Sequence, residues 1–135
     1  MDNLCKDRRA LSKYRLDMAE ECVSSALLEL NANKYKTSAN RAYYAMFHAI
    51  RAVLALDGVD YKKHSAVISY FRQNYIKTGI FDEKYSDTIK YSFNNRINSD
   101  YEDFYVISKD EVEEQIEEAV EFISVVKNVI ENYEI

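Results

Sequence analysis

Residues 38–54, SANRAYYAMFHAIRAVL, form the stretch of sequence that decides the fold. From this stretch to Leu56, apolar residues recur three and four positions apart, which is the spacing of one face of an α-helix. The rings of Tyr43, Tyr44 and Phe47 widen that face. A helix with so broad an apolar surface is expected at the centre of a helical bundle or in an interface.

The composition around this helix favours an all-α protein. The chain has 135 residues, no proline and only two glycines, whereas sheet proteins usually place more of both in their turns. Hydrophobic residues make up 47% of the chain, which is enough for a packed core and is not typical of a disordered protein. We therefore predict one domain over residues 1–135, built from long helices with short connections.

Further helices are predicted on both sides of the central one. Residues 4–31, 64–77 and about 82–98 carry apolar side chains at helical spacing, and a last helix opens at Ser108. Residues 99–107 lose the period and are predicted to form a connector. These elements predict an up-and-down bundle of four or five helices. The expected inner stripes are Leu4, Leu11, Tyr14, Met18, Cys22, Ala26 and Leu30 in the first helix, and Val112, Ile116, Val120, Ile123 and Ile130 in the last.

Residues with known preferences mark several helix ends. Thr37 or Ser38 is a candidate N-cap for the central helix, and Gly58 suits the left-handed position after its C-terminus. Gly79 is expected to close the third helix. Ser108 and the Glu111 that follows three residues later form the pattern of a capping box.

The distribution of charge and the positions of the two cysteines exclude several classes of function. Residues 1–100 carry 16 Lys and Arg against 12 Asp and Glu, whereas residues 101–135 carry 2 against 11. The acidic run is expected to be the solvated face of the last helix. Cys5 and Cys22 lie far apart and form no CxxC pair, so no metal or other cofactor is expected. Without an apolar run of membrane-spanning length or a secretory segment, a cytoplasmic protein is expected.

Two segments together resemble one known family. These are Arg41–Ala49, RAYYAMFHA, and Asn95–Phe104, NRINSDYEDF, with Lys63-His64-Ser65 opening the third helix between them. They resemble the HEPN family (higher eukaryotes and prokaryotes nucleotide-binding domain), and in particular a bacterial and archaeal branch of it. The resemblance covers roughly residues 10–130.

The resemblance implies a helical bundle that dimerises with a second copy. It also implies a partner, a minimal nucleotidyltransferase that acts as antitoxin, and membership of a prokaryotic toxin–antitoxin or defence system. Many members cut RNA without a metal, using an Arg and a His four to six residues after it. The function expected by resemblance is that of a HEPN toxin, and if it is an enzyme, a metal-independent endoribonuclease acting on RNA.

The candidate catalytic residues are Arg96, Asp100 and Tyr101. Arg96 matches the family's Arg and offers a planar fork to phosphate oxygens, but Tyr101 stands where the His would be. A phenol ionises near pH 10 in water and is a poor base at pH 7. Three alternatives stay open for the group that moves the proton and for the role of the tyrosine. Asp100 or Glu102 can act as the base, a histidine can reach the site from another helix or a second copy (His48 or His64), or a tyrosine can be a stacking or nucleotidylated residue (Tyr101 or Tyr105).

Candidate binding residues are Asn95, Arg41 and His48. Each feature also has a structural interpretation. Arg96 and Asp100 lie four residues apart and can form a salt bridge at a helix end. His48 can be a buried core histidine, and His64 can cap a helix. The alternative function is therefore a dimeric HEPN module that binds a nucleotide or a partner without catalysis, and a third is a dimer scaffold.

Overall fold

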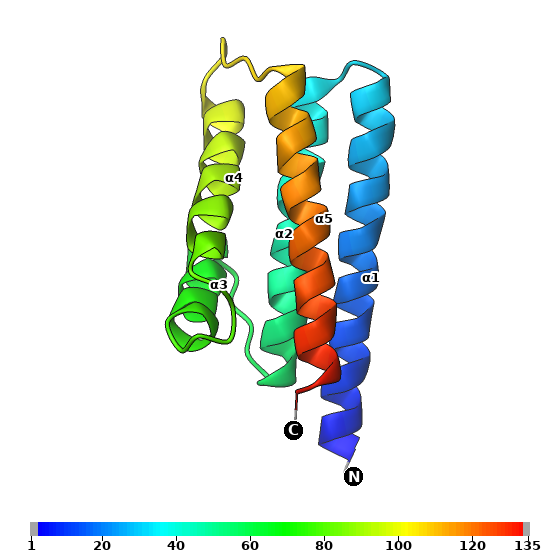
Figure 1. Ribbon diagram of the computed structural model, residues 1–135, viewed down its shortest axis with the longest axis vertical. Helices are drawn as coiled ribbons and strands as arrows, with labels where there is room; N and C mark the ends of the chain where they lie inside the picture. The colour runs from blue at the N-terminus through cyan, green and yellow to red at the C-terminus, as the bar shows by residue number, and fades with distance from the viewer. Residues whose placement is uncertain (1–2, 134–135) are drawn as a thin grey trace.

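The computed structural model describes residues 3–133, which form five α-helices and no β-strand. The short α3 (His64–Phe71) continues directly into a π-helical turn, η1 (Arg72–Ile76). The four longer helices run up and down beside one another, and α3 lies at the lower end near the start of α4 (Figure 1). The predicted all-α up-and-down bundle is confirmed. The longer helices are α1 (Asn3–Asn31), α2 (Tyr35–Leu56), α4 (Lys84–Tyr101) and α5 (Lys109–Glu131).

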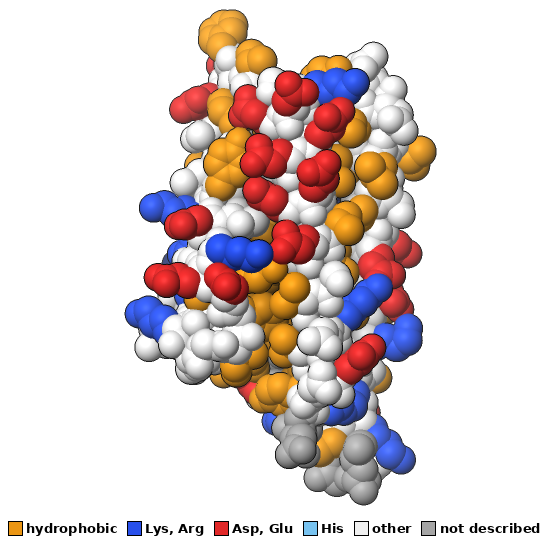
Figure 2. Space-filling model, in the orientation of Figure 1, with side chains coloured by type: hydrophobic (Ala, Val, Ile, Leu, Met, Phe, Trp, Pro, Cys, Tyr) orange, Lys and Arg blue, Asp and Glu red, His pale blue; other side chains and the backbone are white. Residues whose placement is uncertain are grey.

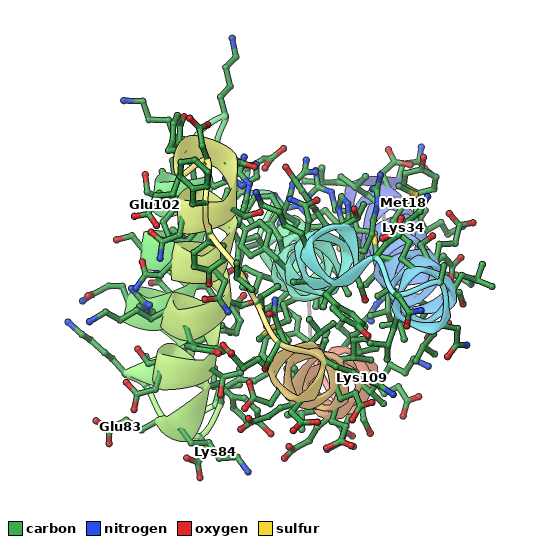
Figure 3. All side chains as sticks on the ribbon, turned by 90° about the horizontal axis from the view of Figure 1, so that it is seen from above. Met18, Lys34, Glu83, Lys84, Glu102 and Lys109 are labelled. Atoms are coloured by element: carbon green, nitrogen blue, oxygen red, sulfur yellow. The ribbon has the colours of Figure 1, made fainter. Side chains whose placement is uncertain are left out.

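Helix α2 is the centre of the bundle, as its broad apolar surface predicted. It packs against α1, α3, α4 and α5. Viewed along the bundle, α1, α2 and α5 form one group and α4 lies beside it (Figure 3). From Ala49 to Leu56 every side chain except that of Arg51 is buried. The site residues that project from α2 are therefore held on a rigid element.

Small side chains set the contact between α1 and α2. The buried residues of α1 are Ser12, Arg15, Ala19, Cys22 and Ala26, and they face the alanines of α2. The hydroxyl of Ser38 donates a hydrogen bond of 2.6 Å to the carbonyl oxygen of Ala26. The predicted stripe is therefore wrong for Leu4, Leu11 and Tyr14, which are exposed. Helix α1 can approach the alanine-rich face of α2 most closely with its own small residues. The larger side chains of α1 therefore point outward.

The N-terminus of α2 differs from the prediction. The helix begins at Tyr35 after Lys34, and no side chain caps it. Ser38 lies inside the helix and is buried, so its hydroxyl bonds to α1 rather than capping α2. The glycine predictions are confirmed, because Gly58 and Gly79 follow their helical segments with φ of 71° and 85°.

Helix α4 continues past residue 98, where the spacing of its apolar residues predicted its end. The prediction of a connector from residue 99 is wrong, since the helix ends at Tyr101 and the backbone N–H of Glu102 still bonds to the carbonyl oxygen of Asn98. The last turn lacks an apolar stripe because little packs against it, as the exposure of Asp100 and Tyr101 shows. Arg96, Asp100 and Tyr101 consequently share one helix.

Helix α5 closes the bundle. Its predicted capping box is confirmed, with Ser108 accepting a hydrogen bond from the backbone N–H of Glu111 and the Glu111 side chain returning to Ser108. The predicted inner stripe holds except at Val120, which is 49% exposed, and Ile130, which is half-buried. Its acidic side chains gather on the outer face of the helix (Figure 2). Within residues 3–133, no helix has the length and apolar character needed to cross a membrane.

Candidate functional site: the Arg96 cluster

The side chain of Arg96 lies across two tyrosine rings of α2. Its guanidinium carbon is 5.5 Å from the centre of the Tyr43 ring and 5.6 Å from that of Tyr44. Such distances allow a cation–π interaction with each ring, which favours one orientation of the guanidinium group. The side chain is 24% exposed, so it is held against α2 but still reaches solvent.

Arg96 has bonding capacity that the protein does not use. Its Nε atom is buried and has no hydrogen-bond partner. The nearest carboxylate oxygen, Oδ2 of Asp100, is 3.7 Å from Nε and so forms an ion pair rather than a hydrogen bond. The predicted ion pair between residues four apart on one helix is thus present. A guanidinium that is partly exposed and not fully hydrogen-bonded can bind an anionic ligand.

Tyr43 joins α2 to the first residue of α3. Its side chain is buried, and its hydroxyl group forms a hydrogen bond of 2.8 Å with Nδ1 of His64. Burial raises the pKa of Tyr43 well above its usual range, although the positive charge of Arg96 acts in the opposite direction. Tyr43 is therefore a neutral phenol at physiological pH, able to donate or accept a proton in a hydrogen bond.

His64 is fixed by aromatic packing as well as by this hydrogen bond. Its ring stacks on Phe47, with the two ring centres 4.0 Å apart and the planes inclined by 20°. The ring centre also lies 5.8 Å from that of Tyr44 in an edge-on arrangement. Tyr43, Tyr44, Phe47, His64 and Arg96 form one group, called the Arg96 cluster below.

Both histidines have a lowered pKa. For His64 the causes are burial and then the charges of Arg96 and Arg51. For His48 they are burial and then the charges of Arg51, Arg15 and His64. Because each pKa lies below the ordinary value of 6.5, both imidazole rings are neutral at pH 7.

A basic hollow adjoins the cluster. It has a volume of about 370 Å³ and lies between α2 and the connector that leads to α3. Asp60 on one wall pairs with Arg51 at 2.8 Å and with Arg15 at 3.2 Å. Burial acts to raise the pKa of Asp60, but the hydrogen bond and charge of Arg51 hold it below its usual value. The hollow is lined by Phe47, Arg51, Asp60, Tyr61, Lys62 and His64.

The other predicted site residues lie in different surroundings. Tyr101 is 83% exposed, and His48 is half-buried beside Tyr44, 6.0 Å between ring centres. Asn95 is buried between α4 and α5, where it donates to Gln115 at 3.4 Å and accepts from Tyr105 at 2.8 Å. The structure thus pairs Arg96 with Asp100, leaves His48 beside Tyr44, and uses Asn95 to join two helices.

Arg41 lies on another side of α2. It is exposed, and its charge acts on the thiol of Cys22 in α1, opposing the rise in the pKa of that thiol caused by burial. The cluster residues that the sequence argument did not place at the site are Tyr43, Tyr44 and Phe47, which were expected in the apolar face of the central helix. No local sequence signal identifies Tyr43 as a site residue, because only the fold shows its hydrogen bond to His64.

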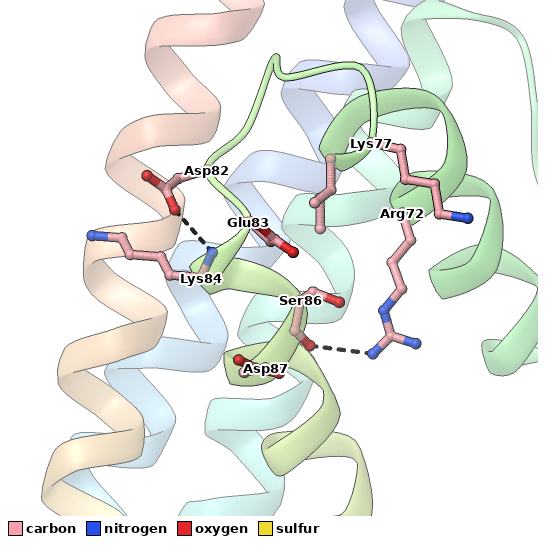
Figure 4. Close-up of a pocket in the computed structure, with 8 residues that line it drawn as sticks. Arg72, Lys77, Asp82, Glu83, Lys84, Ser86 and Asp87 are labelled. Atoms are coloured by element: carbon pink, nitrogen blue, oxygen red, sulfur yellow. Dashed lines mark hydrogen bonds between the residues drawn. The ribbon is translucent and has the colours of Figure 1, made fainter.

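A larger cavity lies elsewhere, between η1 and the start of α4 (Figure 4). It has a volume of about 880 Å³. The side chains of Lys77, Asp82 and Glu83 on its walls carry both signs of charge, and Arg72 donates a hydrogen bond of 3.2 Å to the carbonyl oxygen of Ser86. This cavity contains none of the residues of the Arg96 cluster.

Comparison with known proteins relates the chain to one domain family and to several proteins. The model of the HEPN domain family matches residues 12–129. A protein of Thermotoga maritima named "UPF0332 protein" is 27% identical over 126 residues, covering 93% of this chain and 96% of the relative. Two proteins of Methanocaldococcus jannaschii, named "Putative toxin MJ0605" and "Putative toxin MJ0142", are 32% and 31% identical. The first match covers 94% of both chains, and the second covers 78% of this chain and 71% of the relative.

Proposed function

The chain belongs to the HEPN domain family, and from this membership we propose that it is a toxin whose RNA-directed site is the Arg96 cluster. The match over residues 12–129 confirms the resemblance that the aromatic helix and the Arg96 segment predicted. The toxin names of the two Methanocaldococcus jannaschii relatives support the proposal, since this chain aligns with most of each.

The observation that carries the proposal is the fixed but incompletely bonded guanidinium of Arg96. Tyr43 and Tyr44 hold it in place, and its buried Nε has no hydrogen-bond partner. A phosphate group placed against the exposed part of this guanidinium, whose side chain is 24% exposed, would gain charge-assisted hydrogen bonding with little loss of side-chain entropy. Arg51 and Lys62 beside the cluster add positive charge for an RNA backbone.

The proposed reaction is transesterification of RNA without a metal. The ribose 2′-oxygen attacks the neighbouring phosphorus, and Arg96 stabilises the negative charge that develops on the phosphate oxygens. Asp100 orients Arg96 through their ion pair, and Tyr101, which is largely exposed, is available to stack on a base. The products are a 2′,3′-cyclic phosphate and a 5′-hydroxyl end.

We propose a homodimer as the active form, with a minimal nucleotidyltransferase as antitoxin in the cytoplasm. Exposed hydrophobic side chains next to the site support an interface there. Tyr101, Phe104 and Val106, at the end of α4 and in the connector to α5, are among the most exposed large hydrophobic residues of the described chain. The tip of this connector carries hydrophobic side chains in Figure 2, at the upper end of the molecule. Such residues are typical of a surface that a protein partner covers.

A second candidate is a binding module that holds a nucleotide without cleaving it. The exposure of Tyr101 favours this alternative, because a phenol in water stands where active relatives place a histidine. Losing a general acid or base typically lowers a rate by about 10²- to 10⁴-fold. The same Arg96 cluster would then recognise a phosphate and perform no chemistry.

One experiment separates the two candidates. A mixed RNA substrate is incubated in EDTA with the wild type, Arg96→Ala and Tyr101→Phe, and the dimer content of each is measured by light scattering. Arg72→Ala is the matched control, because Arg72 is also half-buried with an unbonded Nε but lines the other cavity. Cleavage lost only in Arg96→Ala supports the ribonuclease. A folded wild-type dimer that leaves RNA intact but binds nucleotide through Arg96 supports the binding module.

A further inference from the structure

The histidine missing from the helix α4 motif has a spatial counterpart at the start of α3. The His64 ring and the Arg96 guanidinium approach the same two tyrosines, with His64 5.9 Å and 5.8 Å from the ring centres of Tyr43 and Tyr44. Arg96 lies 5.5 Å and 5.6 Å from those centres. Arg96 and His64 come from different helices, so no spacing along the chain relates them.

We propose that His64 is the catalytic proton-transfer residue of the Arg96 site and that Tyr43 is its positioning residue. This inference rests on the proposed ribonuclease function and names the group that moves the proton. The Tyr43 hydroxyl bonds to Nδ1, and Phe47 stacks on the ring, so the second nitrogen, Nε2, is the one left for substrate. His64 also lines the basic hollow, which gives RNA access to the ring.

The proton balance of the step is simple. In the tautomer in which Nδ1–H donates to the Tyr43 oxygen, Nε2 carries a lone pair and accepts the proton of the ribose 2′-hydroxyl. The O2′–P bond forms, the P–O5′ bond breaks, and the leaving 5′-oxygen takes a proton from water. His64 then returns its proton to the solvent, so no further reactant is needed.

The groups around His64 suit a base at neutral pH. Arg96 of α4 and Arg51 of α2 lower its pKa after burial, and His48 of α2 is neutral at pH 7. The connector contributes Asp60, whose charge Arg51 and Arg15 offset, and the lysines at positions 62 and 63. The cleavage rate is therefore expected to rise with pH through a pKa below 6.5 and then to level off.

The test compares cleavage by His64→Ala and His64→Gln with that by the wild type, over a range of pH and with added imidazole. A loss of about 10²-fold or more is expected in both variants, in kcat rather than in KM. Imidazole should restore part of the rate of His64→Ala, because it fits the space that the ring leaves. Circular dichroism and light scattering confirm that each variant folds and dimerises.

Tyr43→Phe tests the positioning role. Without the hydroxyl acceptor, the charged ring is less stable, and the acidic limb of the pH–rate profile should move to lower pH. Tyr75→Phe is the matched control, since Tyr75 is another buried tyrosine with a hydrogen-bonded hydroxyl but belongs to η1 and contacts Asp57. Its profile should be that of the wild type.

A direct readout does not depend on turnover. Adding 2′-O-methyl RNA, which cannot react, should shift the ring resonances of His64 in an NMR spectrum. Cleavage that fails in Arg96→Ala but persists in folded His64 variants would overturn the role of His64 and leave the proposed function intact. A loss without imidazole rescue, or no shift of the His64 resonances, would also overturn it. A wild type that never cleaves RNA would overturn both.

Discussion

Two groups of side chains that include tyrosines lie along helix α2, and they differ in how completely their polar atoms are hydrogen-bonded. At its C-terminal end, Asp57 accepts hydrogen bonds from the hydroxyls of Tyr70, Tyr75 and Tyr133. Nearer its middle, the Arg96 cluster also uses tyrosines, but the Nε of Arg96 has no hydrogen-bond partner. The first group satisfies its polar atoms inside the protein, which indicates a structural role. The second holds a partly exposed cation against two aromatic rings, which fits the proposed binding of an anion.

The pKa values of the tyrosines agree with this contrast. Burial and then the hydrogen bond to Asp57 raise the pKa of Tyr75, and for Tyr133 the hydrogen bond to Asp57 is the larger cause. At Tyr43, by comparison, the nearest charge is positive and opposes the effect of burial. A positive charge that no carboxylate fully neutralises is suited to an anion such as phosphate. The chain's twelve tyrosines therefore cannot be assigned one common role.

The largest effect is expected at the incompletely bonded cluster. Arg96→Ala should lower RNA cleavage by about 10²- to 10³-fold, because it removes the group that we propose to stabilise the developing phosphate charge. The free energy of unfolding should fall by about 1–2 kcal/mol, because the cation–π contacts with Tyr43 and Tyr44 are lost while the partly exposed ion pair contributes little. Initial cleavage rates and urea denaturation measure the two quantities. A large loss of stability with unchanged cleavage would reverse the assignment of the two groups.

Asp57 and the three tyrosines that bond to it, called the Asp57 group here, should affect stability rather than cleavage. Asp57→Ala leaves three tyrosine hydroxyls without their acceptor and should lower the free energy of unfolding by about 3 kcal/mol. RNA cleavage by the folded fraction should stay unchanged. Asp57→Asn is the matched control, since its amide oxygen still accepts a hydrogen bond and the loss should be smaller. Equal losses in the two variants would show that charge, rather than hydrogen bonding, stabilises this end.

Gly58, which follows Asp57, should also affect stability and not cleavage. Its φ of 71° is unfavourable for other residues, and an added Cβ would lie 2.7 Å from Nη2 of Arg8. Gly58→Ala should lower the free energy of unfolding by about 1–2 kcal/mol, mainly through the unfavourable φ because the end of the Arg8 side chain can move, again without changing cleavage. Thermal denaturation checks this, with Gly79→Ala as control because nothing lies within 4 Å of an added Cβ there. A smaller loss for Gly58 than for Gly79 would contradict the contact with Arg8.

The smallest effect is expected from the two histidines. Their pKa values in the folded protein are below 6.5, so the unfolded chain binds protons more readily as pH falls through that value. The free energy of unfolding should therefore fall between about pH 7 and pH 5, and less steeply in the double variant His48→Gln, His64→Gln. Denaturation curves at a series of pH values measure this slope. An unchanged slope in the double variant would mean that carboxylates cause the acid sensitivity.

Much of the fold could be predicted from the sequence because its signals are local. The apolar period of residues 38–54, the capping box at Ser108 and the glycine at position 58 each involve neighbours along one segment. The period failed most clearly where packing decided the outcome. In α1 the alanine face of α2 selected small residues, and the last turn of α4 stayed helical without an apolar stripe.

The site could be predicted only in part for the same reason. Arg96 and Asp100 are four residues apart on one helix, so their ion pair follows from local geometry. Tyr43 and His64 are separated by 21 positions, and their hydrogen bond depends on the course of the connector between α2 and α3. The family pattern predicts the proton-transfer residue shortly after Arg96 in the sequence. The structure instead favours His64, at the start of α3.

The close contact of α1 with α2 has a consequence for the order of folding. A turn of only a few residues after Asn31 joins the two helices, and Ser38 bonds to Ala26 only 12 positions earlier. Contacts between segments so near in sequence require little loop-closure entropy and are expected to form early. The Arg96 cluster also needs α3 and α4, so it is completed in a later step. A nascent chain would thus acquire a helical hairpin well before it completes the site that we propose to act on RNA.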